Sequence, residues 1–275
     1  MEKGIITKNV SNLYVVNTPL GEYSCSPRGL FRHKKIIPLV GDNVEIDIEN
    51  KYITDIFPRK SELERPSVAN IEYAIIVTSL KEPNFSSYLL DKLIARFVLK
   101  NIKPILIFTK LDKANKNELK EYKIIRKYYK KIGYPVFSNR MLFRIKRLLK
   151  GKIAFVVGQT GAGKSTLLNK LNKNLKLKTD EISKALGRGK HTTRHTELYK
   201  IGNFYIADTP GFSALELKDV KKEDLKYSFE EFKEYPCKFK DCNHIKGECN
   251  IKDNNNILKS RYESYKKIYE EIKWK

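Results

Sequence analysis

The sequence lacks the features that would place it in a membrane or outside the cell. No apolar run approaches the 18 or so residues of a membrane-spanning helix, and the first residues do not form a signal peptide. We therefore expect a cytoplasmic protein. Internal repeats and long low-complexity segments are also absent. With 275 residues, 41% of them hydrophobic, the chain has enough apolar side chains to bury a large core and hold two or three small modules.

Acidic residues are scarce as well. The chain has 32 Asp and Glu against 55 Lys and Arg, which gives a net charge of +23. A compositional bias toward lysine would explain why lysine outnumbers arginine, but not the surplus of basic over acidic side chains. Such a surplus is typical of proteins that bind a polyanion, with nucleic acid first. The alternative is a lysine-rich surface that is merely solvated.

Cysteine is rare, and three of the four cysteines lie close together. Cys25 stands alone, whereas the others form a cluster with one histidine: Cys237, Cys242, His244 and Cys249. In a cytoplasmic protein such a cluster favours a metal over disulfides. Four nitrogen and sulfur ligands within thirteen residues suit a tetrahedral, structural Zn²⁺. We predict one zinc ion per chain, against the alternative of buried or spare thiols.

The chain changes character twice along its length. Residues 1–65 contain five short β-prone runs separated by turn residues, which predicts a small OB-type barrel that binds RNA. From 66 to 216, strands and helices alternate in a doubly wound α/β pattern, with functional sites expected at the carboxyl ends of the strands. Residues 217–275 are lysine-rich and irregular around the Cys/His cluster, and end in a helix. The predicted fold class is therefore multidomain α/β.

One segment of the middle region fits the phosphate loop G-x-x-x-x-G-K-[ST] in full. The motif runs Gly158, Gln159, Thr160, Gly161, Ala162, Gly163, Lys164, Ser165, with Thr166 next. It follows an apolar run and precedes a helix-compatible stretch, as the motif requires. Its glycines allow backbone N–H groups to point at phosphate oxygens. We expect Lys164 to bridge the β- and γ-phosphates and Ser165 to bind Mg²⁺.

Two further nucleotide motifs flank this loop, and one of them lies on the wrong side of it for an ordinary GTPase. Thr109-Lys110-Leu111-Asp112 has the T/N-K-x-D form that reads guanine, and it precedes the phosphate loop. Asp208-Thr209-Pro210-Gly211 has the D-x-x-G form of a γ-phosphate and Mg²⁺ sensor. We expect Asp112 to accept two hydrogen bonds from guanine and Lys110 to lay its stem on the base. The complete set in rotated order indicates a circularly permuted P-loop GTPase domain.

The segment between phosphate loop and sensor supplies the remaining candidates. A switch loop must offer a threonine to Mg²⁺ when the γ-phosphate is present, and Thr192 and Thr193 are both available. Phe212 stands where many GTPases carry the glutamine that orients the attacking water. His191 is the nearest side chain able to replace it. The alternative, of equal weight, is that His191 belongs to the switch loop and has no catalytic role.

The predicted site can be stated as one set. The nucleotide ligands are Thr109, Lys110, Asp112, Gly158, Gln159, Thr160, Gly161, Ala162, Gly163, Lys164, Ser165, Thr166, Asp208 and Gly211, and the Mg²⁺ ligands are Ser165, Asp208 and one or both of Thr192 and Thr193.

Together these residues resemble the bacterial small ribosomal subunit biogenesis GTPase family, the RsgA-like proteins. The resemblance covers nearly the whole chain, including Val68–Ala74, Gly187–Thr193 and Asp208–Phe212. It implies an enzyme that hydrolyses GTP to GDP and phosphate, stimulated by the small (30S) subunit, in late maturation of that subunit. It also implies contact with 16S rRNA and a role for His191 in positioning water. We expect a monomer that binds no membrane.

Two other interpretations are compatible with the motifs. One is an RNA-binding sensor of guanine nucleotides with little turnover, which Phe212 keeps open. The other is a permuted GTPase of large-subunit assembly. The barrel before residue 65 and the Cys/His cluster after 237 argue against the latter, because both look foreign to that group.

Overall fold

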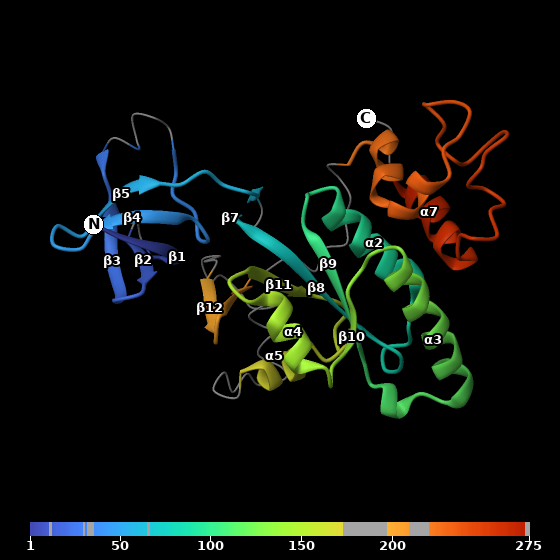
Figure 1. Cartoon of the computed structure of the whole chain (residues 1–275), viewed down its shortest axis with the longest axis horizontal. Coiled ribbons are helices and arrows are strands. Elements are labelled where there is room, and N and C mark those ends of the chain that lie inside the picture. The colour runs from blue at the N-terminus through green and yellow to red at the C-terminus, as the bar shows by residue number, and fades with distance from the viewer. Residues whose placement is uncertain are drawn as a thin grey trace. The chain divides into compact units, whose positions relative to one another are not determined.

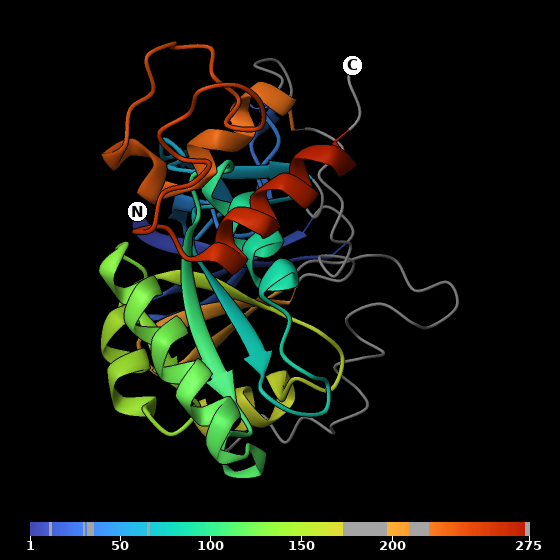
Figure 2. The same cartoon turned by 90° about the vertical axis from the view of Figure 1, so that its right-hand side faces the viewer.

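The computed structural model describes the chain except for residues 11–12, 30, 32–35, 65–66, 173–196, 209–219 and 273–275 (Figures 1 and 2). The chain divides into two compact units, one of residues 1–73, 142–156 and 165–213 and one of residues 74–141, 157–164 and 214–275. In the described residues no helix is both long enough and apolar enough to cross a membrane.

The first unit contains the predicted barrel. Its strands are β1 (Glu2–Val10), β2 (Leu13–Thr18), β3 (Gly21–Pro27), β4 (Asn43–Asp47) and β5 (Tyr52–Ile56). They pair in the order β1-β2-β3-β5-β4, and β1 pairs with β4 as well, so the sheet closes on itself. Alternate side chains such as Ile6, Val16, Val44, Ile46 and Ile53 are fully buried inside it. The five-stranded OB-type barrel is confirmed.

The segment after the barrel is fastened to it. Strands β6 (Glu62–Glu64) and β7 (Ser67–Ala69) form a short hairpin. Arg59 binds both carboxylate oxygens of the buried Asp42 at 2.8 Å. The Asn70 side chain donates to the carbonyl of Gly41 at 2.9 Å. These contacts fix the path by which the chain leaves the barrel.

The barrel sheet continues into strands from later in the chain. Strands β11 (Ile153–Val157), β13 (Phe204–Asp208) and β12 (Glu197–Ile201) follow one another, and β12 pairs with β1. The β11–β13 pair is parallel, whereas β12 runs antiparallel to β13 and to β1. An ion pair between Lys8 and Glu197 at 3.2 Å marks the junction. Helices α4 (Leu142–Leu149) and α5 (Lys164–Leu171) flank β11 in sequence.

The second unit holds the strands and helices around the base-reading motif. Its strands follow the order β10 (Val136–Ser138), β9 (Lys103–Thr109), β8 (Ile71–Ser79). Their continuous apolar runs are buried, as expected for strands covered on both faces. Helix α2 (Ser87–Val98) begins at the Ser86 cap, and η1 (Leu111–Lys113) leads into α3 (Lys116–Lys131), which begins with a capping box of Asn115 and Glu118.

The C-terminal part of this unit has little regular structure. It contains the short helices η2 (Lys222–Ser228) and η3 (Glu230–Glu234) and then α7 (Lys259–Glu271), which packs against α2 (Figure 2). Its core is aromatic: the rings of Phe229, Phe232 and Tyr265 lie 5.0–5.1 Å apart. The predicted C-terminal helix is present, and Tyr262, Tyr265 and Ile268 lie on its buried face.

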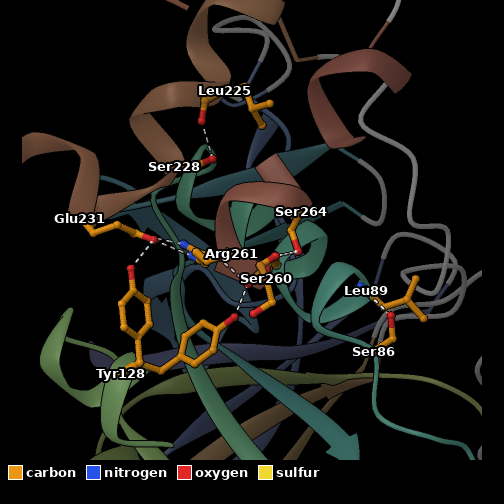
Figure 3. A network of polar contacts seen from close by, with 11 residues as sticks. Ser86, Leu89, Tyr128, Leu225, Ser228, Glu231, Ser260, Arg261 and Ser264 are labelled. Atoms are coloured by element: carbon orange, nitrogen blue, oxygen red, sulfur yellow. Dashed lines mark hydrogen bonds and ion pairs between the residues drawn. The ribbon is translucent and has the colours of Figure 1, made fainter. Parts of the chain in front are cut away.

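A buried ionic network holds α7 in place (Figure 3). The fully buried Arg261 donates to Asp91 of α2 at 2.6 Å and to Glu231 of η3 at 2.8 Å. Its guanidinium lies 4.1 Å from the centre of the Phe229 ring. The Tyr129 hydroxyl of α3 donates to the same Asp91, so the network joins four helices. Burial raises the pKa of Asp91 even though Arg261 lies beside it.

Candidate nucleotide site and metal centre

The phosphate loop turns between β11 and α5, where the sequence predicts it. Gly158, Gly161 and Gly163 all have positive φ angles, of 142°, 80° and 92°. At Gly158 a Cβ atom would lie only 2.0 Å from the carbonyl oxygen of Val77, so that position accepts glycine alone. Gln159, Thr160 and Ala162 fill the turn between the glycines.

Lys164 closes the loop from the first position of α5. Its ammonium donates to the carbonyls of Gly158 and Gln159, both at 2.8 Å. Burial lowers the pKa of Lys164, because the charged form loses hydration that two neutral carbonyls replace only partly. Phosphate oxygens would offset that loss. Ser165 is buried next to it, and Thr166 is exposed.

The base-reading motif is tied directly to this loop. Thr109, at the end of β9, is buried, and its hydroxyl donates to the carbonyl of Ala162 at 2.7 Å. The same hydroxyl lies 3.3 Å from the carbonyl of Thr78. Lys110 then adopts a left-handed conformation with φ of 53°, and Asp112 is exposed on the short helix η1. The structure thus brings together base-reading and phosphate-binding segments that lie 53 residues apart.

Sequence reasoning missed the loop after β8. Glu82 offers its backbone carbonyl to the Lys110 ammonium and its carboxylate to Lys113, at 2.6 Å. The same carbonyl oxygen lies 3.6 Å from where a Cβ on Gly161 would be. Glu82 therefore contacts Lys110 of the T-K-x-D motif and approaches the phosphate loop. No motif marked it, because a backbone carbonyl leaves no trace in residue type. Just after β10, the backbone N–H of Asn139 donates to the carbonyl of Phe108.

The predicted switch and catalytic residues are not placed. His191, Thr192, Thr193 and Gly211 lie outside the described residues. The backbone of Asp208 is described: it ends β13 and pairs with Glu197 of β12. The Mg²⁺ and catalytic assignments therefore stay predictions.

The Cys/His cluster converges on one point. The ligand atoms of Cys237, Cys242, His244 and Cys249 all lie within 4.8 Å of one another. The Cys237 Sγ is 3.6 Å from the Cys249 Sγ, and the His244 Nδ1 is 3.4 Å from each of these sulfurs. A zinc tetrahedron with bonds of about 2.3 Å to sulfur and 2.0–2.1 Å to nitrogen has edges of roughly 3.4–3.8 Å. The spacing of Cys237, His244 and Cys249 therefore fits Zn²⁺, and Cys242 offers a fourth donor within 4.8 Å of them.

Neighbouring groups hold the cluster and set its protonation. The Tyr262 hydroxyl donates to the carbonyl of His244 at 2.8 Å, and the Tyr265 hydroxyl to that of Asn243 at 2.6 Å, so α7 fixes the ligand loop. Burial, aided by the nearby Lys226, lowers the pKa of His244 to about 4. The imidazole is then neutral near pH 7, as a metal ligand must be.

These features define a P-loop nucleotide-binding protein whose base-reading motif precedes its phosphate loop and whose C-terminal part offers a metal site. A family model described as the RsgA GTPase matches residues 56–218, and one described as the RsgA N-terminal domain matches residues 3–54. The chain belongs to the RsgA GTPase family. It is a circularly permuted GTPase, an enzyme that hydrolyses GTP, as the motifs and the resemblance predicted.

Relatives and solved structures agree over the whole chain. "Small ribosomal subunit biogenesis GTPase RsgA 2" of Oceanobacillus iheyensis is 44% identical over 99% of this chain and 98% of its own. The crystal structure of YjeQ from Thermotoga maritima is 34% identical and superposes with a TM-score of 0.85, covering 98% of each chain. That of YloQ, described as a circularly permuted GTPase, has 32% identity and a TM-score of 0.84, covering 99% of this chain and 95% of its own.

Proposed function

We propose that this GTPase acts in the biogenesis of the small ribosomal subunit, binding the 30S subunit with GTP and leaving it after hydrolysis to GDP and phosphate. The names of its relatives support this role, because 44% identity over 99% of the chain leaves little of the protein unmatched. The observation that carries the nucleotide part is the hydrogen bond from Thr109 to Ala162, which couples base and phosphate recognition.

The positions of the residues at the ends of the elements support the roles that we propose for them. Asp112 accepts from guanine while Lys110, anchored on the Glu82 carbonyl, covers the base. Lys164 leaves its two loop carbonyls for the β- and γ-phosphate oxygens. Ser165, Asp208 and Thr192 or Thr193 would hold Mg²⁺, which would neutralise charge on the phosphate oxygens.

Hydrolysis requires a group that orients the attacking water, and we assign this role to His191. Phe212 follows the sensor motif and cannot hydrogen-bond to water. In His191→Ala we expect subunit-stimulated turnover to fall far more than GTP affinity, as for a group that acts mainly in the transition state. Equal losses would make His191 a switch residue instead.

The remaining assignments concern metal, partner and place. We assign one structural Zn²⁺ per chain to Cys237, Cys242, His244 and Cys249. We propose that the partner surface on the subunit includes 16S rRNA, which the net charge of +23 favours. We further propose that the protein is a monomer in the cytoplasm. Its chain would be divided into three domains, residues 1–65, 66–216 and 217–275.

Co-sedimentation with separated ribosomal subunits tests the proposal. Binding to small subunits should be strong with a non-hydrolysable GTP analogue and weak with GDP, and small subunits should raise GTP turnover. Equal binding with both nucleotides would exclude the switch. Tighter binding to large subunits would favour large-subunit assembly, and binding without stimulated turnover would favour a nucleotide sensor.

A further inference from the structure

The positive charge of the chain is unevenly distributed. Residues 1–65 hold 10 basic and 9 acidic side chains, and residues 217–275 hold 15 and 12. Residues 66–216 hold 30 basic and 11 acidic side chains. The barrel and the metal-site region are therefore close to neutral. The surplus that indicates a polyanionic partner belongs to the GTPase part of the chain.

Within that part, one stretch has no acidic residue at all. Between Glu121 and Asp180 the sequence has 16 Lys and Arg and no Asp or Glu over 58 residues. At the average composition of the chain, about seven acidic residues would be expected there. A bias of lysine over arginine does not remove acidic residues. The stretch begins in α3, where the structure shows how the charges are arranged.

Helix α3 carries a continuous line of lysines on its exposed side, which we name the α3 stripe. Its members are Lys116, Lys120, Lys123, Lys127 and Lys130, spaced four, three, four and three residues apart, and all are exposed. This spacing places them on one face of a helix. Within the described residues, none of them forms an ion pair.

Intrahelical pairing does not explain the stripe. A solvated helix commonly alternates glutamate and lysine three or four residues apart. The two glutamates of α3, Glu118 and Glu121, lie three or four residues from no lysine of the stripe. Glu118 is engaged with Lys81 at 2.7 Å and with the helix cap. Each lysine of the stripe thus has only basic residues, lysines or Arg126, as charged neighbours at these spacings within the helix.

The arrangement disfavours the isolated helix. Each like-charged pair at this spacing costs about 0.2–0.5 kcal/mol, and a lysine in the first turn opposes the helix dipole. Only Lys130, in the last turn, is favourably placed by that dipole. An external polyanion would convert this repulsion into attraction.

The other face of α3 is not available for binding. Tyr122, Ile125 and Tyr129 are buried in the second unit, where Tyr129 meets Asp91. The exposed side therefore offers charge with one apolar side chain, Ile124, which is 59% exposed. A helix that lies on a membrane needs an exposed apolar face. The chemistry of the stripe suits phosphates in a polar partner better than lipid.

We propose that the α3 stripe binds the phosphate backbone of RNA, as a site on the GTPase part of the chain rather than on its two flanking modules. From Lys116 to Lys130 the stripe spans about 21 Å at 1.5 Å per residue, enough to follow several phosphates. Lysine is a compact point charge, so the contact would position RNA without reading its sequence. The identification of that RNA as ribosomal rests on the proposed function.

The position of α3 connects this contact to the nucleotide. The helix starts at Lys116, four residues after Asp112, and only Ala114 separates its cap residue Asn115 from η1. Lys113, in that turn, is paired with Glu82, whose carbonyl holds Lys110. RNA bound along α3 would therefore approach the segment that reads guanine.

A four-lysine variant tests the proposal in the full chain. Lys120, Lys123, Lys127 and Lys130 are changed to Gln, which keeps a similar helix propensity. Affinity for small subunits with a GTP analogue is measured at several salt concentrations. Because each phosphate contact contributes about 0.7–0.9 to the slope of log affinity against log salt, the slope should fall by about 3. Affinity near 0.15 M salt should fall at least about tenfold. Far-UV circular dichroism checks that the helix is kept.

The matched control removes the same charge elsewhere. Lys238, Lys240, Lys246 and Lys252 are also exposed and lie in the metal-site region. Changing these four to Gln should lower the salt slope by less than about 1.

Equal losses in both variants would show that only net charge matters, and an unchanged stripe variant would place the RNA contact elsewhere. Either result overturns the stripe, while GTP-dependent binding by the wild type still supports the proposed function. If the stripe variant loses affinity for anionic lipid vesicles but keeps its affinity for subunits, the partner of the α3 stripe is lipid rather than RNA.

Discussion

The nucleotide site and the metal-site region are built in different ways. The phosphate loop is shaped by backbone conformation: three glycines with positive φ angles and a lysine that binds carbonyls five and six residues away. The metal-site region depends on side chains from distant parts of the chain. Arg261 reaches Asp91 across 170 residues, and two tyrosines of α7 support the loop that carries His244.

This difference predicts where each region is fragile. A site made from backbone fails locally, when a residue cannot adopt the required φ angle or when an atom overlaps a neighbour. A region with few helices and strands fails as a whole, because a metal or a buried ion pair replaces part of the apolar core that it lacks. Four substitutions sharpen this comparison, from the largest expected effect to the smallest.

The largest effect is expected at the metal. Cys242→Ser should lose the zinc ion and unfold residues around 217–275 locally, because structural zinc contributes roughly 10–16 kcal/mol of apparent binding free energy in small modules. Elemental analysis and amide hydrogen exchange by segment measure both changes. Cys25→Ser, at a thiol buried in the barrel, is the control and should keep one zinc ion per chain. A native protein that folds without metal would refute the assignment.

The next effect is expected at the buried ionic network. Arg261→Met should destabilise the protein by about 3–5 kcal/mol, because it leaves Asp91 and Glu231 buried without their cation. Urea unfolding with excess zinc measures the loss. In the matched variant, Asp91→Leu and Glu231→Leu accompany Arg261→Met, and most of the stability should return. If the triple variant is as unstable as the single one, lost packing rather than unpaired charge is responsible.

The same difference explains what the sequence could reveal. The phosphate loop, the base-reading motif and the Cys/His cluster are each encoded within about thirteen residues, so residue type and spacing predict them. The barrel was predictable because turn residues separate its β-prone runs. The buried ionic network could not be predicted. The chain has 55 basic and 32 acidic residues, and nothing in the sequence marks Arg261, Asp91 and Glu231 as the buried ones.

Other parts escaped prediction for a related reason. The pairing of β1 with β12 joins residues 8 and 197, and a strand edge carries no signal for its partner. Glu82 acts through its backbone carbonyl, which every residue has. Sequence patterns report local backbone needs and amphipathic faces, whereas long-range pairing depends on the folded arrangement.

At the phosphate loop the expected effect is local and depends on position. Gly158→Ala should abolish tight nucleotide binding, because a Cβ would lie 2.0 Å from the carbonyl oxygen of Val77 at a φ of 142°. The strain and overlap should cost about 3 kcal/mol. Gly161→Ala is the control in the same loop: its φ is also positive, but the nearest atoms lie at 3.6 Å. Calorimetric titration with GDP should show a much smaller loss there. Equal losses of GDP affinity in the two variants would mean that the positive φ angle alone, and not the close approach to Val77, makes glycine necessary at these positions.

The smallest effect is expected at the base, because it changes preference and leaves the fold alone. Asp112 is exposed on η1, so Asp112→Asn removes no buried contact. In the role that we propose for Asp112, the change replaces a carboxylate that accepts two hydrogen bonds from guanine by an amide that accepts one and donates one. Losing a hydrogen bond to a charged group costs about 1.5–3 kcal/mol, so GTP affinity should fall about 10- to 100-fold.

Xanthine, which carries a carbonyl in place of the guanine amino group, can accept from the new amide. Competition between GTP and XTP measures the preference, with the melting temperature as a check on folding. An unchanged preference for GTP would show that residues 109–112 do not read the base, even though Thr109 is bound to the phosphate loop.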